Sequence, residues 1–334
     1  MINSIEHIVT QLCDEMPPEH ELGRTKHLAS QLHEEVRRAI PGTLMTIGTR
    51  TKFGSLALAP RDALATIKEY RTRPFMRGML KAVEEARRRF PGEKIRILYA
   101  GTGPAAPLVL PILMRYTPDE VQVDAIDIHK RSIDALKCFN DINGTQNYYS
   151  SYRTGDAITY RHVGEPPHII VSETMAAGLL VEPQAYITRN LAPQLIPDGI
   201  FVPEGIDLTL SQFLPPLHHS VTRIGDMHTF NASDFMKPPL NPQDTMSVHS
   251  RSRLASTAKS CVGIQLDTRV RCFGGEEVLP MQSLITHPHR FQIDVPNGAT
   301  IAGIDVSYVL GSEQVQLALL DEAGEVQSSE KMEV

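Results

Sequence analysis

The chain has 334 residues, of which 41% are hydrophobic and 22% are charged, and its formal net charge is -6. These values are typical of a globular protein and argue against intrinsic disorder, which needs fewer apolar residues and a larger net charge. The acidic balance supplies no positive field for nucleic acid, and the cationic run Arg87, Arg88 and Arg89 is expected to end a helix, where it offsets the dipole.

The cysteines and the N-terminus bear on the cellular compartment. Cysteines occur at four scattered positions, Cys13, Cys138, Cys261 and Cys272. Their spacing matches no metal site, and the N-terminus lacks the apolar run of a secretory signal. No segment approaches the roughly 20 apolar residues that span a bilayer. We therefore expect a reduced, cytoplasmic protein that binds no metal ion, no membrane and no nucleic acid.

The first third of the chain is predicted to be helical. Apolar residues recur at helical spacing over residues 2–12 and 22–40, and Pro41 with Gly42 ends the second pattern. An irregular piece follows to residue 60. Helical periodicity then returns over residues 62–90, where Pro74 predicts a kink or break because proline lacks the N–H that an interior helical position donates.

From residue 95 the pattern changes to short apolar runs that alternate with helical stretches. The runs cover residues 95–100, 121–126, 168–171 and 199–203, and the helical stretches cover residues 108–116, 131–140 and 185–195. This alternation predicts an α/β fold with a doubly wound, mainly parallel, Rossmann-like sheet.

Beyond residue 204 the helical periodicity fades. Five runs read as antiparallel strands, at residues 206–210, 268–273, 291–295, 304–310 and 315–319. Residues 214–244 are rich in proline and histidine and are predicted to form a long loop or lid. We expect an N-terminal helical region over residues 1–60, a Rossmann-like cofactor-binding domain over 61–203, and a β-rich, barrel-like domain for substrate binding or dimerisation over 204–334.

A glycine turn follows the first predicted strand. The segment reads Tyr99-Ala-Gly101-Thr-Gly103-Pro104, and a Gly-x-Gly turn before a helix lets the backbone approach a bound nucleotide closely. The third small position is Ala105, and a proline lies inside the turn. A nucleoside site is therefore favoured over a pyrophosphate-cradling dinucleotide fingerprint.

Two aspartates follow later strands of the same sheet. Asp127 ends the second strand, where a carboxylate can accept both ribose hydroxyls, although it could instead cap the next helix. Asp156, in Gly155-Asp156-Ala157, could accept the adenine amino group or be an ordinary turn aspartate.

Two glutamates lie nine residues apart in a loop after the third apolar run. Glu173 ends a strand at the carboxyl edge of the sheet, where open α/β folds bind their ligands, although a hydrogen bond to loop backbone is the alternative. Glu182 precedes Pro183 and could equally be the N-terminal acid of a helix. The histidines of the predicted lid, His218, His219 and His228, could supply a base or line a site, but a solvated loop is favoured.

These residues resemble a class I S-adenosyl-L-methionine-dependent methyltransferase, and more closely its arginine methyltransferase-like branch. The similarity covers residues 53–79 and 97–203, nearly half of the chain. It implies S-adenosylmethionine as co-substrate and makes Arg71 the partner of its methionine carboxylate. A guanidinium suits that role because its planar fork binds a carboxylate bidentately. A solvated helix position is the alternative for Arg71.

The resemblance also assigns the remaining cofactor contacts. It implies that Gly101 and Gly103 form the cofactor turn, that Asp127 binds the ribose, and that Asp156 with Ala157 borders the adenine. Tyr99 would lie beside the sulfonium, where an aromatic face stabilises positive charge, or would be a core residue. Residues 195–203 are similar to the family's passage from the sheet into a C-terminal β-barrel.

The acceptor side matches the family only in part. The spacing from Glu173 to Glu182 equals that of a loop whose two glutamates grip an acceptor guanidinium and localise its charge. The family's aromatic and methionine positions near the acceptor are changed, and the chain contains no tryptophan. The departures are Leu56, Ala65, Tyr99, Ala105 and Thr174, and residues 286–288 match the family's Thr-His-Trp loop too weakly to carry a role. A small-molecule acceptor is therefore favoured over a peptide.

The sequence thus predicts a methyltransferase of small-molecule biosynthesis. Its acceptor would be a natural-product or amino-acid-like amine, amidine or alcohol, with Glu173 and Glu182 as the catalytic pair. One alternative is chemistry at the γ-carbon of S-adenosylmethionine, either aminocarboxypropyl transfer or closure of an azetidine ring, which releases methylthioadenosine. Two others are a protein arginine methyltransferase and a degenerate binding protein, against which the cofactor residues argue. A homodimer is one option for the assembly.

Overall fold

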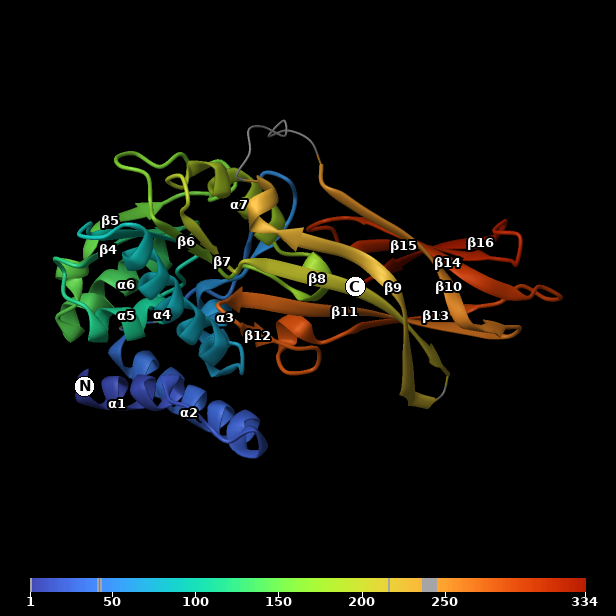
Figure 1. Ribbon diagram of the computed structural model, residues 1–334, viewed down its shortest axis with the longest axis horizontal. Helices are drawn as coiled ribbons and strands as arrows, with labels where there is room; N and C mark the ends of the chain where they lie inside the picture. The colour runs from blue at the N-terminus through green and yellow to red at the C-terminus, as the bar shows by residue number, and fades with distance from the viewer. Residues whose placement is uncertain (1, 41, 43, 216, 236–244) are drawn as a thin grey trace.

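The computed structural model describes every residue except 1, 41, 43, 216 and 236–244, and Figure 1 shows its three parts. Two N-terminal helices lie beneath a parallel sheet that carries helices on its faces. A β-rich half extends from that sheet toward the opposite end of the molecule.

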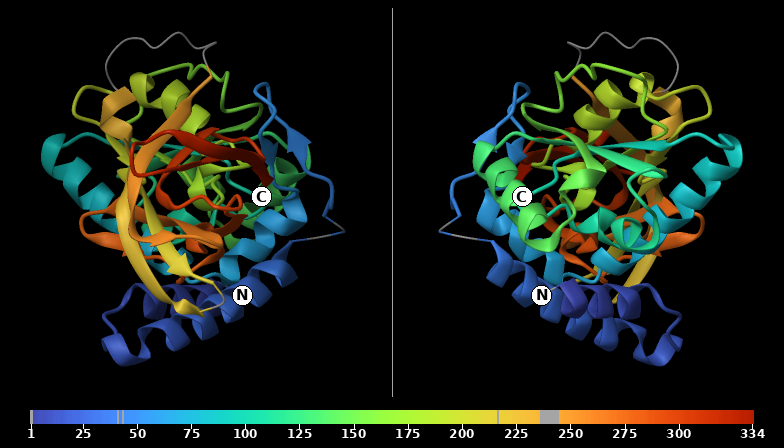
Figure 2. Two further views of the ribbon diagram at one scale, coloured as in Figure 1. Left: turned by 90° about the vertical axis from the view of Figure 1, so that its right-hand side faces the viewer. Right: turned by 90° about the vertical axis from the view of Figure 1, so that its left-hand side faces the viewer.

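The N-terminal pair consists of α1 (Ile2–Cys13) and α2 (Pro18–Ala39), which lie side by side (Figure 2). Leu12, Leu32 and Val36 form a fully buried cluster with residues of the later helices, so the pair is packed onto the rest of the chain. The predicted helical face is confirmed for these residues. Leu22, however, is 43% exposed and lies off that face.

The next segment differs from its prediction. A short hairpin of β1 (Thr49–Arg50) and β2 (Leu56–Ala57) leads into α3 (Pro60–Ala65), η1 (Thr66–Lys68) and α4 (Thr72–Arg89). The break falls between η1 and α4, upstream of Pro74. That proline lies in the first turn of α4, where its missing N–H would have had no helical partner. The three arginines of residues 87–89 form the last turn of α4, as predicted.

The central sheet has five parallel strands in the order β5-β4-β3-β6-β7, which confirms the predicted α/β class. Its strands are β3 (Ile95–Ala100), β4 (Val121–Asp127), β5 (Tyr149–Thr154), β6 (Ile169–Ser172) and β7 (Ile200–Val202). The connections contain η2 (Pro107–Val109), α5 (Leu110–Arg115), α6 (Lys130–Asn143), η3 (Gln146–Tyr148), η4 (Ala177–Leu179), α7 (Gln184–Leu191) and η5 (Ala192–Gln194).

Alternation along β3 shows how the two faces of the sheet are covered. Ile97 and Tyr99 belong to one buried cluster with Phe75 of α4, whereas Leu98 belongs to another with Ile187 of α7. Because all five strands run in parallel, their carboxyl ends meet at one edge. The glycine turn, Asp127 and the glutamate loop all begin at that edge.

The β-rich half is antiparallel, as predicted. One sheet has the order β12-β11-β8-β9, with β13 also paired to β11, and the other has the order β10-β14-β15-β16. Its strands are β8 (Gly205–Leu214), β9 (Leu217–Asn231), β10 (Ser247–Ala258), β11 (Cys261–Phe273), β12 (Glu276–Val278), β13 (His289–Asp294), β14 (Ile301–Val309), β15 (Gln314–Leu320) and β16 (Val326–Glu333), with η6 (Ala232–Phe235) and η7 (Leu284–Thr286).

The predicted lid over residues 214–244 is wrong for most of its length. Residues 217–231 form β9, which pairs with β8 along its whole length, although the pairing shifts register in three places. Those shifts break the strict two-residue alternation by which a strand is recognised in a sequence. His228 pairs with Leu208 of β8 and does not line the cavity described below. The side chains of His218 and His219, and residues 236–244, lie outside the described residues.

Candidate active site

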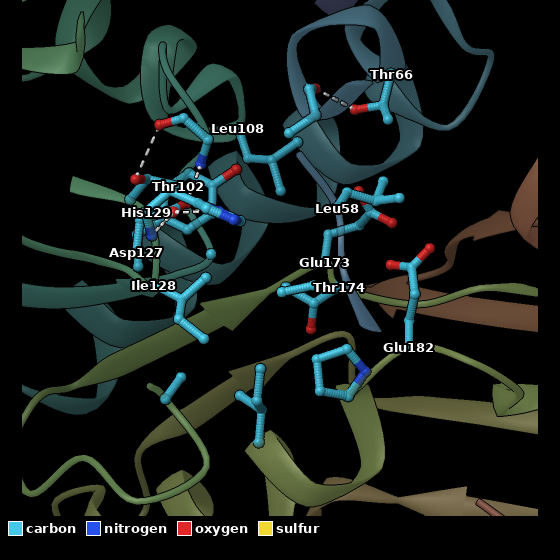
Figure 3. Close-up of a pocket in the computed structure, with 18 of the residues that line it drawn as sticks. Leu58, Thr66, Thr102, Leu108, Asp127, Ile128, His129, Glu173, Thr174 and Glu182 are labelled. Carbon is cyan, nitrogen blue, oxygen red and sulfur yellow. Dashed lines mark hydrogen bonds and ion pairs between the residues drawn. The ribbon is translucent and has the colours of Figure 1, made fainter. Parts of the chain in front are cut away.

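A cavity at the carboxyl edge of the parallel sheet brings the predicted site residues together. The space that it spans is about 930 Å³, a volume that includes space open to solvent. All nine predicted residues line it, namely Arg71, Tyr99, Gly101, Gly103, Asp127, Asp156, Ala157, Glu173 and Glu182. Figure 3 shows Asp127 on one side of this cavity and the two glutamates on the other.

Asp127 holds the glycine turn against the end of β4. Its Oδ2 accepts a hydrogen bond from the Gly103 N–H at 2.9 Å, and its Oδ1 accepts one from the His129 N–H at 2.8 Å. The N-cap of α6 is His129, so Asp127 does not itself cap that helix and instead binds the backbone just before it. An ionised carboxylate has about four acceptor sites, so two remain for hydroxyl donors.

Position 101 requires glycine for two reasons, its backbone conformation and the nearby side chain of Thr174. Its φ of +76° lies in the left-handed region, and a Cβ there would overlap Cγ2 of Thr174. We expect Gly101→Ala to lower the free energy of unfolding by about 2 to 3 kcal/mol, the sum of backbone strain and overpacking. Denaturant unfolding would measure it. Gly92→Ala is the matched control, because Gly92 has a φ of +81° with nothing within 4 Å. Equal losses in the two variants would show that the contact with Thr174 contributes nothing.

Asp156 and Tyr99 form two further walls of the cavity. Asp156 Oδ1 accepts a hydrogen bond from the Ile158 N–H at 2.9 Å, so this residue does form a turn of the ordinary aspartate kind. Its other oxygen lies 3.5 Å from the Lys52 N–H of the β1–β2 hairpin. Tyr99 is buried, and burial with the nearby Glu173 holds the pKa of its hydroxyl well above the usual value. Its ring is therefore neutral at physiological pH.

Glu173 and Arg71 form a buried ion pair in the cavity. Arg71, the N-cap of α4, places Nη2 at 3.2 Å from Glu173 Oε2. The other carboxylate oxygen, Oε1, is buried and has no hydrogen-bond partner among the described residues. Burial raises the pKa of Glu173 to about 7, although Arg71 opposes the shift. A buried oxygen without a partner costs free energy, so this atom is poised for a donor from a ligand.

Glu182 reaches the same cavity through a strained turn. Its N–H donates to the Leu180 carbonyl at 2.6 Å, and Val181 between them has a φ of +64°, which is rare for a β-branched residue. Helix α7 begins two residues later, and Glu182 is not its N-cap. Burial, and then the charge of Glu173, raises the pKa of Glu182 to about 7. Two carboxyl groups can therefore exchange protons near neutral pH in one cavity.

The raised pKa of Glu182 has a consequence for stability. The pKa of Glu182 is about 7 in the folded protein, compared with the usual 4.5, so folding favours the neutral acid. The resulting contribution to the free energy of unfolding is full below about pH 4.5 and is lost as the pH rises through 7. We expect Glu182→Gln, which keeps the shape and removes the charge, to be more stable than the parent by about 1 to 3 kcal/mol at pH 8. The difference should shrink toward pH 5. Urea unfolding at both pH values tests this, and a variant less stable at pH 8 would contradict it.

The β-rich half fixes the loop that carries both glutamates. The Gly178 N–H donates to Thr268 Oγ1 of β11, and the Tyr308 hydroxyl of β14 donates to the Gly178 carbonyl, both at 2.7 Å. The Gly311 N–H donates to the Leu179 carbonyl at 2.8 Å. Two strands of the C-terminal half therefore hold the loop in place through hydrogen bonds.

This anchoring predicts the effect of removing one hydroxyl. Thr268→Val keeps the side-chain shape but leaves the buried Gly178 N–H without its acceptor, so we expect a loss of about 1 to 3 kcal/mol in unfolding free energy. Thr257→Val, on the exposed face of β10, is the control and should change stability by less than about 0.5 kcal/mol. Unfolding in denaturant would compare the two. A Thr268 variant as stable as the control would show that the loop does not depend on this bond.

Sequence reasoning missed several residues of the cavity. His129 is buried beside Asp127, and its Nε2 lies 3.0 Å from Oγ1 of Thr49 in the β1–β2 hairpin. Leu58, just after that hairpin, lines the wall near the glutamates. The position of His129, two residues after an acid that ends a strand, was a usable signal. The contribution of the hairpin could not be predicted, because nothing in the sequence of residues 44–60 indicates where that segment lies.

Three further observations concern the described part of the chain. Within it, no group of three or more His, Cys, Asp or Glu side chains is arranged to hold a metal ion. The four cysteines are not joined by disulfides. No helix among the described residues is long and apolar enough to cross a membrane.

Comparisons with known proteins identify the fold. No family model matches the sequence, and no curated protein matches it. Among solved structures, the PRMT1 enzyme–prozyme heterotetrameric complex of Trypanosoma brucei with AdoHcy aligns with a TM-score of 0.53 at 12% identity, over 78% of this chain and 93% of that chain. Protein arginine methyltransferase 10 of Arabidopsis thaliana, in an open conformation, aligns with a TM-score of 0.54 at 11% identity, over 84% of this chain and 97% of that one.

Both likenesses span most of each chain and include the parallel sheet as well as the β-rich half. At this level of identity they establish the architecture and leave the substrate open. The resemblance found in the sequence is thereby confirmed for the fold, because the chain has the same architecture as these two arginine methyltransferase structures.

Proposed function

We propose that this protein is an S-adenosylmethionine-dependent methyltransferase that acts on a small, nitrogen- or hydroxyl-bearing acceptor. The observation that carries the proposal is the single cavity in which a strand-end aspartate, a buried arginine and two carboxyl groups of raised pKa meet. Arginine methyltransferases share the fold, which makes this cofactor the natural one to test.

The chain's residues suit that cofactor chemically. Asp127 keeps acceptor capacity for two ribose hydroxyls, and Arg71 is a buried cation that can pair with the methionine carboxylate. Arg71 approaches Glu173 most closely through one terminal nitrogen. A guanidinium carries five N–H donors, so the pair with Glu173 does not use all of them. Asp156 and Ala157 would border the adenine, and Tyr99 would face the sulfonium. When bound, the cofactor supplies an electrophilic methyl group.

The two glutamates would then act on the acceptor. With a pKa of about 7, Glu173 can take a proton from a nucleophile near neutral pH, and its unpartnered Oε1 can accept the N–H or O–H that orients it. Glu182 offers a second acceptor in the same cavity. The low exposure of both groups favours the transfer by excluding water from the charges that develop there.

One set of measurements tests the proposal. Calorimetric titration with S-adenosylmethionine should give a saturable heat, and incubation with amine, amidine and alcohol acceptors should yield S-adenosylhomocysteine and a methylated product by mass spectrometry. Methylthioadenosine formed from the cofactor alone would instead establish γ-carbon chemistry. Methylation confined to arginine-rich peptides would establish a protein substrate, and absence of cofactor binding would leave only a binding or scaffolding role.

The proposal includes a cytoplasmic location and a homodimeric assembly. The trypanosomal neighbour forms a heterotetrameric complex, and two-fold symmetric homodimers are the commonest soluble oligomers. Light scattering on the purified protein would measure the assembly, and a monomer at micromolar concentration would overturn that part.

A further inference from the structure

A turn of rare backbone conformation directly precedes Glu182. Val181 has a φ of +64°, and it is the only β-branched residue among the non-glycine residues of positive φ in the described part of the chain. The Glu182 N–H donates to the Leu180 carbonyl at 2.6 Å and closes a three-residue turn centred on Val181. Such turns with positive φ are strained, and a branched side chain adds to the strain. The backbone before Glu182 is therefore not the one that valine prefers.

The chain on the other side of Glu182 is fixed. Pro183 restricts the backbone of the residue before it, and the Gln184 N–H donates to the Thr174 carbonyl at 3.1 Å. A change of φ at Val181 is therefore absorbed by the residues next to it and turns the Glu182 side chain. In Figure 3 the carboxyl group of Glu182 lies on the glutamate side of the cavity, which is the place that such a turn would alter.

Two hydrogen bonds from distant segments hold Val181 in this conformation. Its N–H donates to the Ser312 carbonyl, in the turn between β14 and β15, at 3.0 Å. Its carbonyl accepts from the Leu56 N–H, at the start of β2, at 2.7 Å. A strained residue persists only where its surroundings hold it, and the cost of the strain corresponds to at least about a fivefold preference for an ordinary backbone. Loss of either bond would therefore let the turn relax.

The hairpin, the glutamate loop and the β14–β15 turn meet at Gly311. A Cβ at this position would lie 3.0 Å from Cβ of Ser55 in the hairpin and 3.4 Å from the carbonyl oxygen of Glu182. The hairpin is also tied to the same turn by an ion pair of 2.9 Å between Arg50 and Glu313. Val181 therefore keeps its bond to the hairpin while the hairpin stays docked against this turn.

We propose that Val181 is a positioning residue whose strained backbone makes the place of Glu182 depend on the β1–β2 hairpin. With the hairpin docked, the Leu56 N–H and the Ser312 carbonyl hold Val181 at positive φ, and Glu182 faces the cavity. When the bond to the hairpin is lost, Val181 relaxes and Glu182 turns away. The inference rests on the proposed function for the role of Glu182 in transfer, but the movement itself needs no substrate.

The first test follows the Glu182 carboxyl group in the whole protein without any ligand. A carbon-13 NMR titration reports its protonation, and Glu182→Gln assigns the signal. In the parent, burial and then the charge of Glu173 raise the pKa of Glu182 to about 7. Leu56→Pro removes the N–H that binds Val181, so the titration midpoint should fall by at least about half a pH unit as the carboxyl group reaches water. An unchanged midpoint in the folded variant would overturn the proposal.

A double substitution separates strain from the simple loss of a bond. Glycine adopts positive φ as readily as negative φ, so in a Val181→Gly background the turn has little strain to release. Leu56→Pro should there shift the midpoint by less than half as much as in the parent. The matched control is Asp198→Gly, because Asp198 also has a positive φ, +62°, but is exposed and does not line the cavity.

In the Asp198→Gly background, Leu56→Pro should shift the midpoint as far as it does in the parent. Equal shifts in the Val181→Gly and Asp198→Gly backgrounds would refute the role of Val181. If Leu56→Pro does not fold, Arg50→Ala takes its place, because it removes the side-chain bonds to Glu313 and to the Gly54 carbonyl. It should give a smaller shift of the same sign with the same dependence on background, and no shift would overturn the proposal.

The rate of methyl transfer gives a second readout. In single-turnover measurements at saturating cofactor, Leu56→Pro should lower the rate at least about fivefold in the parent and less than about twofold in the Val181→Gly background. Equal losses in the two backgrounds would count against the proposal.

These readouts separate the two proposals. Absence of S-adenosylmethionine binding or of methyl transfer in the parent would end the proposed function, while the titration still decides the role of Val181. Conversely, methyl transfer by a protein in which the Glu182 midpoint does not respond to the hairpin would end this inference alone.

Discussion

Glu173→Gln should lower the rate of methyl transfer at least about 100-fold while leaving the affinity for S-adenosylmethionine within a fewfold of the parent. The substitution keeps the size of the side chain but removes the group that can take a proton, and a positioned general base contributes roughly 10² to 10⁴ in rate. Single-turnover measurement of S-adenosylhomocysteine formation would separate this chemical step from binding.

The same residue predicts the pH dependence of the reaction. Because burial raises the pKa of Glu173 to about 7, the carboxylate that accepts a proton is a minority species at pH 6 and predominates at pH 8. We therefore expect kcat/KM of the parent to rise with pH through about 7, and the Glu173 variant to lack the part of the rise that this group supplies. A parent rate that is independent of pH between 6 and 8 would refute the role of Glu173 as a base.

Glu276 provides a matched control for this substitution. Its side chain is 12% exposed, compared with 11% for Glu173, and it is also paired with an arginine, Arg77. It does not line the cavity of the candidate site. Glu276→Gln should therefore reduce stability without reducing the rate. If both variants lost activity equally, a general effect of breaking a buried ion pair would explain the result.

Arg71→Ala should weaken binding of S-adenosylmethionine about 100-fold, which equals about 2.8 kcal/mol. The guanidinium is buried in the cavity and is the cation assigned to the methionine carboxylate, so its removal leaves that carboxylate without the charged donor that would pair with it. Calorimetric titration would measure the change.

The neighbouring Arg73 allows a sharp comparison. It is equally buried and forms an ion pair with Glu21 of α2 at 2.7 Å, but it does not line the cavity. Arg73→Ala should destabilise the protein through loss of this pair while cofactor affinity stays near that of the parent. Should Arg71→Ala bind the cofactor as well as Arg73→Ala does, the assignment of Arg71 would be wrong.

Much of the cofactor half could be predicted because its signals are local. Strand β3 occupies residues 95–100 as predicted, the glycine turn directly follows it, and Asp127 is the last residue of β4; both strands contain clear apolar runs. In a parallel sheet the carboxyl ends of the strands lie at one edge, so residues at those ends are close together in space. The glutamate loop joined that list for the same reason.

What could not be predicted depends on contacts between distant parts of the chain. The ion pair of Arg71 with Glu173 joins residues 102 apart in sequence, and no periodicity encodes it. Strand β9 was missed because its register shifts disrupt the alternation. Turn η7, in the C-terminal third of the chain, lines a second cavity together with Glu182, and these residues are 102 or more apart in sequence. The domain boundaries at residues 60 and 203, and the roles of the cavity residues, stay predictions.

The bonds from β11 and β14 to the glutamate loop also bear on how the molecule opens. Gly178 is hydrogen-bonded to both strands, and the amide of Gly311 is bonded to Leu179. Local unfolding of the β-rich half therefore releases the glutamates, and a ligand that immobilises the glutamates suppresses that unfolding. Hydrogen exchange at the Gly311 amide, far from any atom that reacts, thus becomes a gauge of occupancy at the acceptor end of the site.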